Sequence, residues 1–334
     1  MAQIANTFET YDAVGNREEL SDTIHMITPE ETPAISLIGR MSVATTHPEW
    51  QTDTMRTPVT TNNVPEGNDW SFDATTPTTR IGNYTQISED TFIISASQEK
   101  TDKAGRKSEV AHETAKAGVE LRTDIEVTVL SNQASSAGTG NGATNRTSAG
   151  MRAWLTTNDS LGAGGGASGS FSNGIQSAAT NGTQRPFTKA LFDDVILSTY
   201  NAGGNPDVLM TSPYVKTVFS RILDDADVVP LRKAVSNGQA TIVAAADTYL
   251  SDFGLITVVP NRQMARAGAT VARNAFLIDP KMASVGYFRD IKVNTPAKTG
   301  DSEKRVLNAE WTLVMKNEAA HGVVADLYGL SASS

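Results

Sequence analysis

The chain has 334 residues, 39% of them hydrophobic, a formal net charge of −9 and no cysteine. This length allows two domains with cores of their own, and the absence of cysteine excludes disulfides and thiolate metal sites. The negative charge argues against a nucleic-acid-binding module, because phosphate contacts need a basic face, but it allows a protein that encloses nucleic acid without gripping it.

The start of the chain, MAQIANTFETYDAVGNR, contains neither a basic region nor an apolar run, so we expect no signal peptide. No stretch of the sequence is apolar over enough residues to span a membrane. These features predict a soluble protein made inside the cell. We expect residues 1–16 to form an extended arm, followed by a short helix at 17–27 and a second apolar patch at 34–38.

Residues 42–88 differ in composition from the rest of the chain. They are rich in Thr, Asn and Asp, contain four prolines, and carry only isolated hydrophobic residues. Such a segment cannot bury a core of its own, so we predict a long two-stranded loop that packs against another surface. The alternative is a disordered loop. Its tryptophans and charged side chains suit a contact surface. The candidate contact residues are Glu49, Trp50, Arg56, Glu66, Trp70, Phe72 and Arg80.

A strand at 84–98 leads into one long helix, predicted at 108–133. Ser108 suits the N-cap, and an acidic first turn complements the helix dipole. Helical periodicity predicts a buried stripe, with Arg122 lying inside it and needing an acceptor. The opposite face should be solvated, with Lys116 pairing with acidic residues on either side of it. The predicted stripe contains Ala111, Ala115, Gly118, Ile125 and Val129, with Leu121 beside it.

The segment after the helix is rich in glycine and serine. We expect a turn at 134–147, a short strand or turn at 150–157 anchored by Trp154, and a flexible loop at 161–183 containing GAGGGASGSFSNG. A phosphate cradle is not expected in this loop, because no Lys-Ser/Thr pair follows and no strand-to-helix frame surrounds it.

The second half alternates helices and strands. Thr188 suits the cap of a helix to about residue 200, and Ser212-Pro213 suits the start of another. Strands are predicted at 207–210, 241–249, 255–259, 275–278, 306–314 and 322–327, with a charged connection at 224–239. This order predicts an α+β or α/β domain.

Residues that could perform catalysis are scattered. His25, His47, His112 and His321 lack metal-ligand spacing. The carboxylate pairs at 193–194 and 224–225 lie in polar surroundings, whereas a general acid would need an apolar pocket. No Gly-x-Ser-x-Gly nucleophile elbow is present. We therefore expect no catalytic, cofactor-binding or metal-binding residue.

Four stretches carry a resemblance to a known family. They are Gly105-Arg106 before the long helix, GMRAWLTTN at 150–158, SDFG with VPNR at 251–262, and AKTGDSEKRVLNAEWTLVMKNEAAHG at 297–322. Together they resemble tailed-bacteriophage major capsid proteins with the HK97-like fold. The resemblance spans nearly the whole chain, and the closing stretch is its most specific part.

The resemblance implies an α+β fold divided along the chain. Residues 1–41 would be the N-terminal arm, 42–88 the extended β-hairpin loop, 89–187 a peripheral domain with the spine helix, 188–285 the axial domain, and 286–334 the return to the peripheral domain. The implied function is a shell of pentamers and hexamers, icosahedral or elongated, enclosing double-stranded DNA in the virion. The implied partners are other copies of the chain, portal and decoration proteins, and a separate scaffold, because the long helical prodomain of some members is missing.

Two further expectations concern how the shell is held together and what else the protein could be. Some relatives join subunits by an isopeptide bond from a loop lysine, but residues 42–98 contain no lysine. Since an arginine stays protonated and cannot act as that nucleophile, we expect non-covalent contacts. The alternative function is a glycan-binding or glycan-degrading virion protein, in which Trp50 and Trp70 would stack on sugars.

Overall fold

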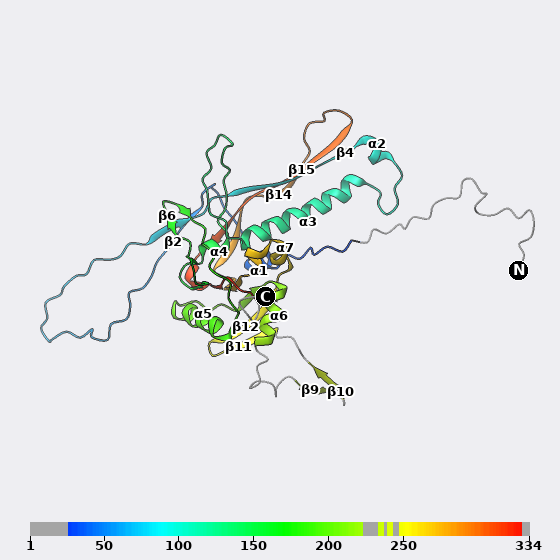
Figure 1. Cartoon of the computed structure of the whole chain (residues 1–334). Coiled ribbons are helices and arrows are strands. Elements are labelled where there is room, and N and C mark those ends of the chain that lie inside the picture. Colours follow the sequence, from blue (N-terminus) through cyan, green and yellow to red (C-terminus); the bar gives the residue numbers. More distant parts are fainter. Residues whose placement is uncertain (1–25, 223–232, 237–238, 243–246, 329–334) are drawn as a thin grey trace, which may run out of the picture.

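The computed structural model describes residues 26–222, 233–236, 239–242 and 247–328 (Figure 1). The predicted helix at 17–27 lies outside these residues except for its last two positions, which are not helical, and His25 and the carboxylate pair at 224–225 also lie outside them. Helices and strands are mixed along the chain, so the α+β prediction is confirmed.

A four-stranded sheet forms one half of the body, in the order β1 (Arg40–Ser42), β14 (Ala283–Asn294), β15 (Ser302–Met315) and β4 (Gln86–Ser95). The neighbours β14–β15 and β15–β4 are antiparallel, and β1 runs parallel to β14. The predicted strand at 84–98 is shorter than expected, because Ser95 caps the short helix α2 (Ala96–Lys100). The sheet therefore joins strands from the first third of the chain to strands near its C-terminal end.

The long helix α3 (Glu109–Leu130) lies along this sheet, beside β4 and β15 (Figure 1). The Ser108 side chain accepts a hydrogen bond from the Ala111 amide, which confirms the predicted N-cap, but the helix ends three residues earlier than predicted. Lys116 lies 3.6 Å from a Glu113 oxygen and 3.8 Å from a Glu120 oxygen, as the spacing predicted.

The predicted buried face of α3 is partly wrong. Ala111 and Ala115 are exposed, because the first half of the helix lies beyond the core, and Arg122 is exposed as well. Arg122 donates to the Thr32 hydroxyl at 3.2 Å. The buried residues all come from the second half of the helix: Ala117, Leu121, Ile125, Glu126, Val129 and Leu130.

A six-stranded sheet forms the other half, in the order β11 (Thr248–Ser251), β12 (Gly254–Pro260), β8 (Val208–Thr211), β13 (Ala275–Ile278), β16 (Gly322–Val324) and β5 (Asp159–Ser160). Its last two strands come from outside the range 188–285 that we expected to form one domain. The predicted caps at Thr188 and Ser212 are found at α5 (Lys189–Asn201) and α6 (Pro213–Ile222). These helices and the sheet enclose a core with Phe187, Phe192 and Phe219.

Short elements complete the described chain. Residues 150–157, expected as a strand or turn, contain the helical turn α4 (Met151–Trp154). The others are α1 (Pro33–Ile38), α7 (Arg262–Arg266), α8 (Ala269–Ala272), the 3-10 turn η2 (Glu318–Ala320), and the strand pairs β2 (Glu49–Thr52) with β3 (Thr79–Gly82), β6 (Phe171–Ser172) with β7 (Ile175–Gln176), and β9 (Lys233–Ser236) with β10 (Gln239–Ile242). Among the described residues, no helix combines the length and apolar character needed to cross a membrane.

Candidate inter-subunit surface

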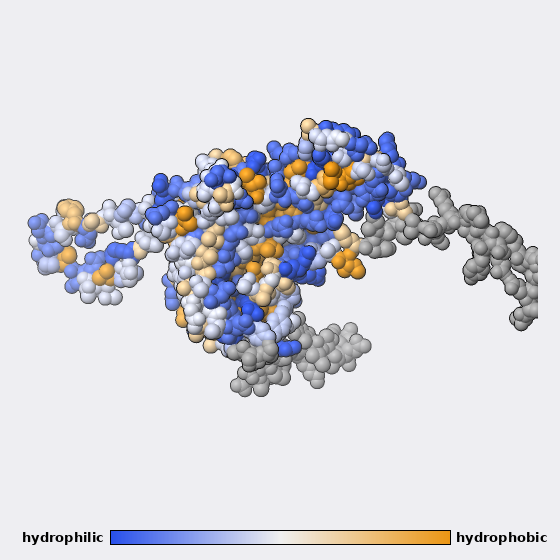
Figure 2. Space-filling model, turned by 45° about the horizontal axis from the view of Figure 1, so that its top comes forward, coloured by the Kyte–Doolittle hydropathy of each residue, from blue (hydrophilic) through white to orange (hydrophobic). Residues whose placement is uncertain are grey.

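The most prominent surface feature is the extended loop, residues 53–78, which connects the antiparallel strands β2 and β3. It projects far from the body in Figure 1, and in Figure 2 hydrophobic residues lie among hydrophilic ones on it. Every residue from 53 to 80 is exposed. Exposed apolar side chains include Met55, at 98% of its full surface, Phe72 at 90% and Trp70 at 83%. The loop therefore presents apolar groups that its own chain does not cover.

An aromatic stack anchors the base of this loop to the body. The Trp50 ring in β2 lies 5.8 Å from the Trp154 ring of α4, and Trp154 lies 5.8 Å from the Phe171 ring of β6. Trp50 is half-buried and packs against the main core. Its ring thus holds the loop onto its own chain, whereas Trp70 lies out on the loop.

A buried amide fixes the end of the loop. Asn83, which follows β3 and is fully buried, donates from its side chain to the Leu313 carbonyl oxygen at 2.8 Å. Its side-chain oxygen accepts from the Ala149 amide at 2.9 Å. These bonds tie the loop to β15 and to the segment before α4, so the direction in which the loop leaves the body is set by side-chain contacts.

A buried carboxylate on β15 adds a second anchor, which the sequence reasoning missed. Glu310 is 3% exposed and accepts hydrogen bonds from the Thr85 hydroxyl at 2.7 Å and from Arg289 at 2.9 Å. Arg146 also pairs with it and donates to the Thr85 carbonyl oxygen. Two guanidinium groups can compensate one buried carboxylate. The only sequence signal was a glutamate inside a strand that is otherwise largely apolar near its C-terminal end.

The seven predicted contact residues divide into two groups. At the base, Glu49 and Arg80 lie on paired strands, with Arg80 Nε 3.4 Å from Glu49 Oε1, whereas Trp50 on β2 pairs with Ile81 and packs against Trp154. The remaining four are exposed on the loop itself: Arg56, Glu66, Trp70 and Phe72. The structure therefore pairs Glu49 with Arg80, packs Trp50 on the body, and leaves the other four residues without contacts to the core.

A second buried carboxylate, also missed by the sequence reasoning, holds the N-terminal part of the described chain. Glu126 of α3 is completely buried and accepts from the amides of Ala34 and Ile35 at 2.7 and 2.8 Å. It also accepts from the Asn261 side chain at 2.7 Å. Burial raises the pKa of Glu126, and the hydrogen bonds from α1 oppose that shift. The carboxylate therefore joins the spine helix, α1 and the end of β12.

The glycine-rich segment at 161–183 is held by definite hydrogen bonds, although its composition predicted a flexible loop. Asp326 has a left-handed backbone, with φ of 60°, and its carboxylate accepts from the amides of Gly162 and Gly182 at 3.0 and 2.9 Å. A Cβ at Gly162 would lie 2.0 Å from the Thr183 carbonyl oxygen, so only glycine allows this approach. Asp326 thus pins the two ends of the segment together.

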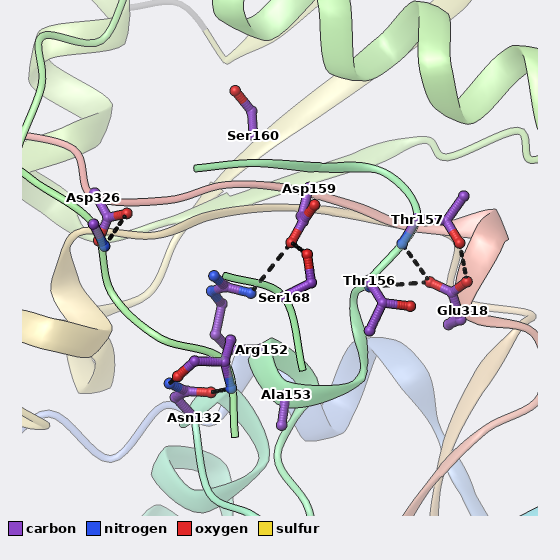
Figure 3. A network of polar contacts seen from close by, with 12 residues as sticks. Asn132, Arg152, Ala153, Thr156, Thr157, Asp159, Ser160, Ser168, Glu318 and Asp326 are labelled. Atoms are coloured by element: carbon purple, nitrogen blue, oxygen red, sulfur yellow. Dashed lines mark hydrogen bonds and ion pairs between the residues drawn. The ribbon is translucent and has the colours of Figure 1, made fainter. Parts of the chain in front are cut away.

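Figure 3 shows a buried cation beneath this segment. The Arg152 side chain of α4 is completely buried, and Nη1 lies 4.0 Å from Asp159 Oδ2. Asp159 also accepts from the Ser168 hydroxyl at 2.6 Å. Burial lowers the pKa of Arg152, and the nearby carboxylates of Asp159 and Asp326 oppose that shift. These charges link α4 and the glycine-rich segment to the six-stranded sheet.

The histidines among the described residues do not form a common site. His47 stacks on Tyr84 at the loop base, with ring centroids 4.1 Å apart, while His321 is completely buried near the start of β14. Within the part of the chain that the structure describes, no group of three or more His, Asp or Glu side chains is arranged to hold a metal ion. The Asp193 carboxylate, one of the paired carboxylates, accepts from Tyr249 and Lys189 on the surface of the protein.

We predict that acid weakens the fold through His321. Burial lowers its pKa to about 4, from 6.5 for an ordinary histidine. The unfolded chain therefore takes up this proton first, so stability is complete above about pH 6.5 and falls as the pH drops towards 4, by up to about 3 kcal/mol. Urea unfolding between pH 7.5 and 4.5 should show a shallower decline for His321→Gln than for the unmodified chain. Equal slopes for the two proteins would contradict the prediction.

Comparisons with known proteins agree over nearly the whole chain. The family model described as SU10 major capsid protein matches residues 3–328. The major capsid protein of Escherichia phage Phieco32 is 25% identical over 345 residues, covering 95% of this chain and 96% of that protein.

Solved structures show the same fold. The capsid of a native GTA particle has a TM-score of 0.61 at 14% identity, covering 96% of this chain and 98% of that one. A structure from Gordonia phage Cozz has a TM-score of 0.60 at 15% identity, covering 98% and 97%. The fold expected from the resemblance is confirmed, and since the family model matches nearly every residue, the chain belongs to the SU10 major capsid protein family.

Proposed function

We propose that copies of this chain assemble into pentamers and hexamers that form the head shell of a tailed phage, icosahedral or elongated, around double-stranded DNA. In this proposal the chain is made in the host cytoplasm, ends in the virion and performs no catalysis. The observation that carries the proposal is the extended loop, since residues 53–80 are exposed while Trp50, Asn83 and Thr85 fix the base. A loop that is fixed at its base and exposes aromatic groups along its length suits a contact with another copy.

The geometry of such a contact favours rings. A loop that leaves one side of the body and lies across a different surface of the next copy makes a head-to-tail contact, and repeated head-to-tail contacts close into rings when the rotation allows it. Each aromatic side chain covered in this way contributes about 1.5–3 kcal/mol. We also propose that the six-stranded sheet lies towards the ring axis and the spine helix towards its periphery.

Electron microscopy of the purified protein tests this function. We expect pentamers, hexamers or shells from the unmodified chain. A variant in which residues 55–76 are replaced by a short Gly-Ser linker should fold but stay monomeric, because the anchors at the loop base remain. An unmodified chain that stays monomeric at every concentration would overturn the proposal, and so would a shortened variant that still forms shells.

The surrounding partners are proposed from the resemblance alone. They are a separate scaffold protein, a portal and decoration proteins. The glycan-binding alternative is not proposed, because Trp50 packs against Trp154 while Trp70 lies exposed on the loop, so the two rings have different surroundings.

We predict that the shell contains no covalent cross-links between subunits. The loop region carries Arg56 and Arg80 but no lysine, and the chain has no cysteine. Heads boiled in detergent should therefore run as a single band near 35.5 kDa. A ladder of covalent oligomers in that gel would contradict the prediction.

We also predict that isolated subunits bind duplex DNA weakly. The net charge is −9, and phosphate binding needs clustered Lys and Arg. Filter binding or gel shift at physiological salt should show no tight complex. This result would agree with a shell wall that encloses DNA without binding it tightly. A complex that forms at nanomolar subunit concentration and dissolves with added salt would show that a basic inner surface exists after all.

A further inference from the structure

Asparagine followed by glycine occurs three times among the described residues, at Asn141, Asn173 and Asn181. Such a pair can react with itself, because the glycine nitrogen can attack the side-chain carbonyl carbon of the asparagine and no Cβ on the glycine hinders the approach. The surroundings of each pair decide how readily this happens. They set the access of water, the freedom of the attacking nitrogen and the stabilisation of the charge that develops.

The attacking nitrogen is free at the first pair. Asn141 and Gly142 are exposed at the tip of a hairpin, between Thr139 and Thr144, whose backbones are joined by a hydrogen bond of 3.1 Å. The Gly142 amide donates no hydrogen bond within the described ranges. A Cβ placed on Gly142 would meet nothing within 4 Å. Water therefore reaches both the nitrogen and the side chain that it would attack.

Two donors already point at the oxygen of the Asn141 side chain. The Thr139 hydroxyl donates to Oδ1 at 2.6 Å, and the Ala143 amide donates to the same atom at 3.1 Å. Negative charge develops on this oxygen when a nitrogen attacks Cγ, and donors that are in place beforehand stabilise such a charge. The hairpin tip therefore promotes attack on its own asparagine.

The other two pairs are restrained. The Gly182 amide donates to Asp326 Oδ2 at 2.9 Å, so its nitrogen must leave a carboxylate before it can attack Asn181. Asn173 and Gly174 form the two-residue turn between the paired strands β6 and β7. Closing a five-membered ring at Asn173 requires a rotation of the backbone that would break this strand pairing. Both pairs should therefore react slowly in the folded chain.

We propose that Asn141 is a site of spontaneous deamidation. The Gly142 nitrogen gives its proton to hydroxide and bonds to Asn141 Cγ, and the bond from Cγ to Nδ2 breaks as ammonia leaves. Water then opens the resulting succinimide ring at either carbonyl, which leaves aspartate or isoaspartate. Overall, water is consumed and ammonia is released, with no change of oxidation state. Since residues 136–145 carry no charged side chain, the product places a carboxylate on a neutral hairpin.

Peptide mapping by mass spectrometry tests the site on the purified full-length chain, stored at mildly alkaline pH. The Asn141 peptide should convert to aspartate and isoaspartate at least about tenfold faster than the Asn181 and Asn173 peptides, since a hydrogen bond to a carboxylate is worth about that factor. The control is the same chain stored in urea, in which the three rates should converge. Equal rates in the folded chain, or a difference that persists in urea, would overturn the proposal.

Two variants at Thr139 test the role of the hydrogen-bond donors. Thr139→Val removes the hydroxyl that donates to Asn141 and should slow deamidation roughly three- to tenfold, the range expected for one hydrogen bond. Thr139→Ser keeps a hydroxyl at this position and should react like the unmodified chain. A hairpin that merely restrained Asn141 would give the opposite sign, because Thr139→Val would loosen it. Unchanged or faster deamidation in Thr139→Val would therefore show that the hairpin does not promote the reaction.

Discussion

Replacing Ile125 by Asp should abolish soluble subunits. Ile125 is completely buried on α3, within the main core beside Leu121 and Val129. A carboxylate at this position would have to ionise without a partner or be protonated, and either costs several kcal/mol, which is a large part of the stability of a domain. Expression of Ile125→Asp should give only insoluble protein, and no heads.

The matched control for this prediction lies on the same helix. Ala115, which the sequence placed on the buried stripe, is exposed in the structure. Ala115→Asp should therefore fold and form heads, with a stability change within about 0.5 kcal/mol. Normal heads from Ile125→Asp, or collapse of Ala115→Asp, would show that the buried face of α3 is assigned wrongly.

Replacing Glu126 by Ala should release α1 from the spine helix. The change leaves the amides of Ala34 and Ile35 and the side chain of Asn261 without their acceptor. A buried donor without a partner costs about 1–3 kcal/mol, so three of them together are a large loss. We expect a midpoint of thermal unfolding lower by roughly 10 °C, and faster tryptic cleavage after Arg40 in the folded subunit.

The control for Glu126 is Glu120→Ala. Glu120 is exposed on the same helix and pairs only with Lys116 among the described residues, at 3.8 Å. Removing an exposed pair of this kind changes stability by less than about 1 kcal/mol. If both alanine variants have the same midpoint of thermal unfolding as the unmodified chain, the buried carboxylate does not hold α1.

The elements of the fold were largely predictable because their signals are local. The N-caps at Ser108 and Thr188 and the periodicity of α3 lie within short windows of sequence. The rotation of the buried face was less predictable, since Ala111 and Ala117 have the same hydropathy, and only the position of the sheet decides which is covered. The six-stranded sheet shows the same limit, because β5 and β16 join it from distant parts of the chain.

The anchors of the candidate surface could not be predicted, because they pair residues far apart in sequence. Glu126 and Glu310 look like surface residues in any hydropathy profile, and their burial depends on donors such as Ala34 and Arg146. Trp50 was predicted as a contact residue, but its half-buried place against Trp154 depends on where α4 lies. Exposure of Trp70 and Phe72 could be expected, since no nearby sequence could cover them.

The pinned ends of the glycine-rich segment suggest where this protein could carry a foreign peptide. Asp326 already holds Gly162 and Gly182 together, so the entropy of closing this loop is lost before any residue is inserted. Gly165 lies between them, exposed, with open space around it. Doubling the length of a flexible loop adds only about 0.6 kcal/mol. An epitope inserted at this position should therefore leave the subunit folded, which would make the segment a display site.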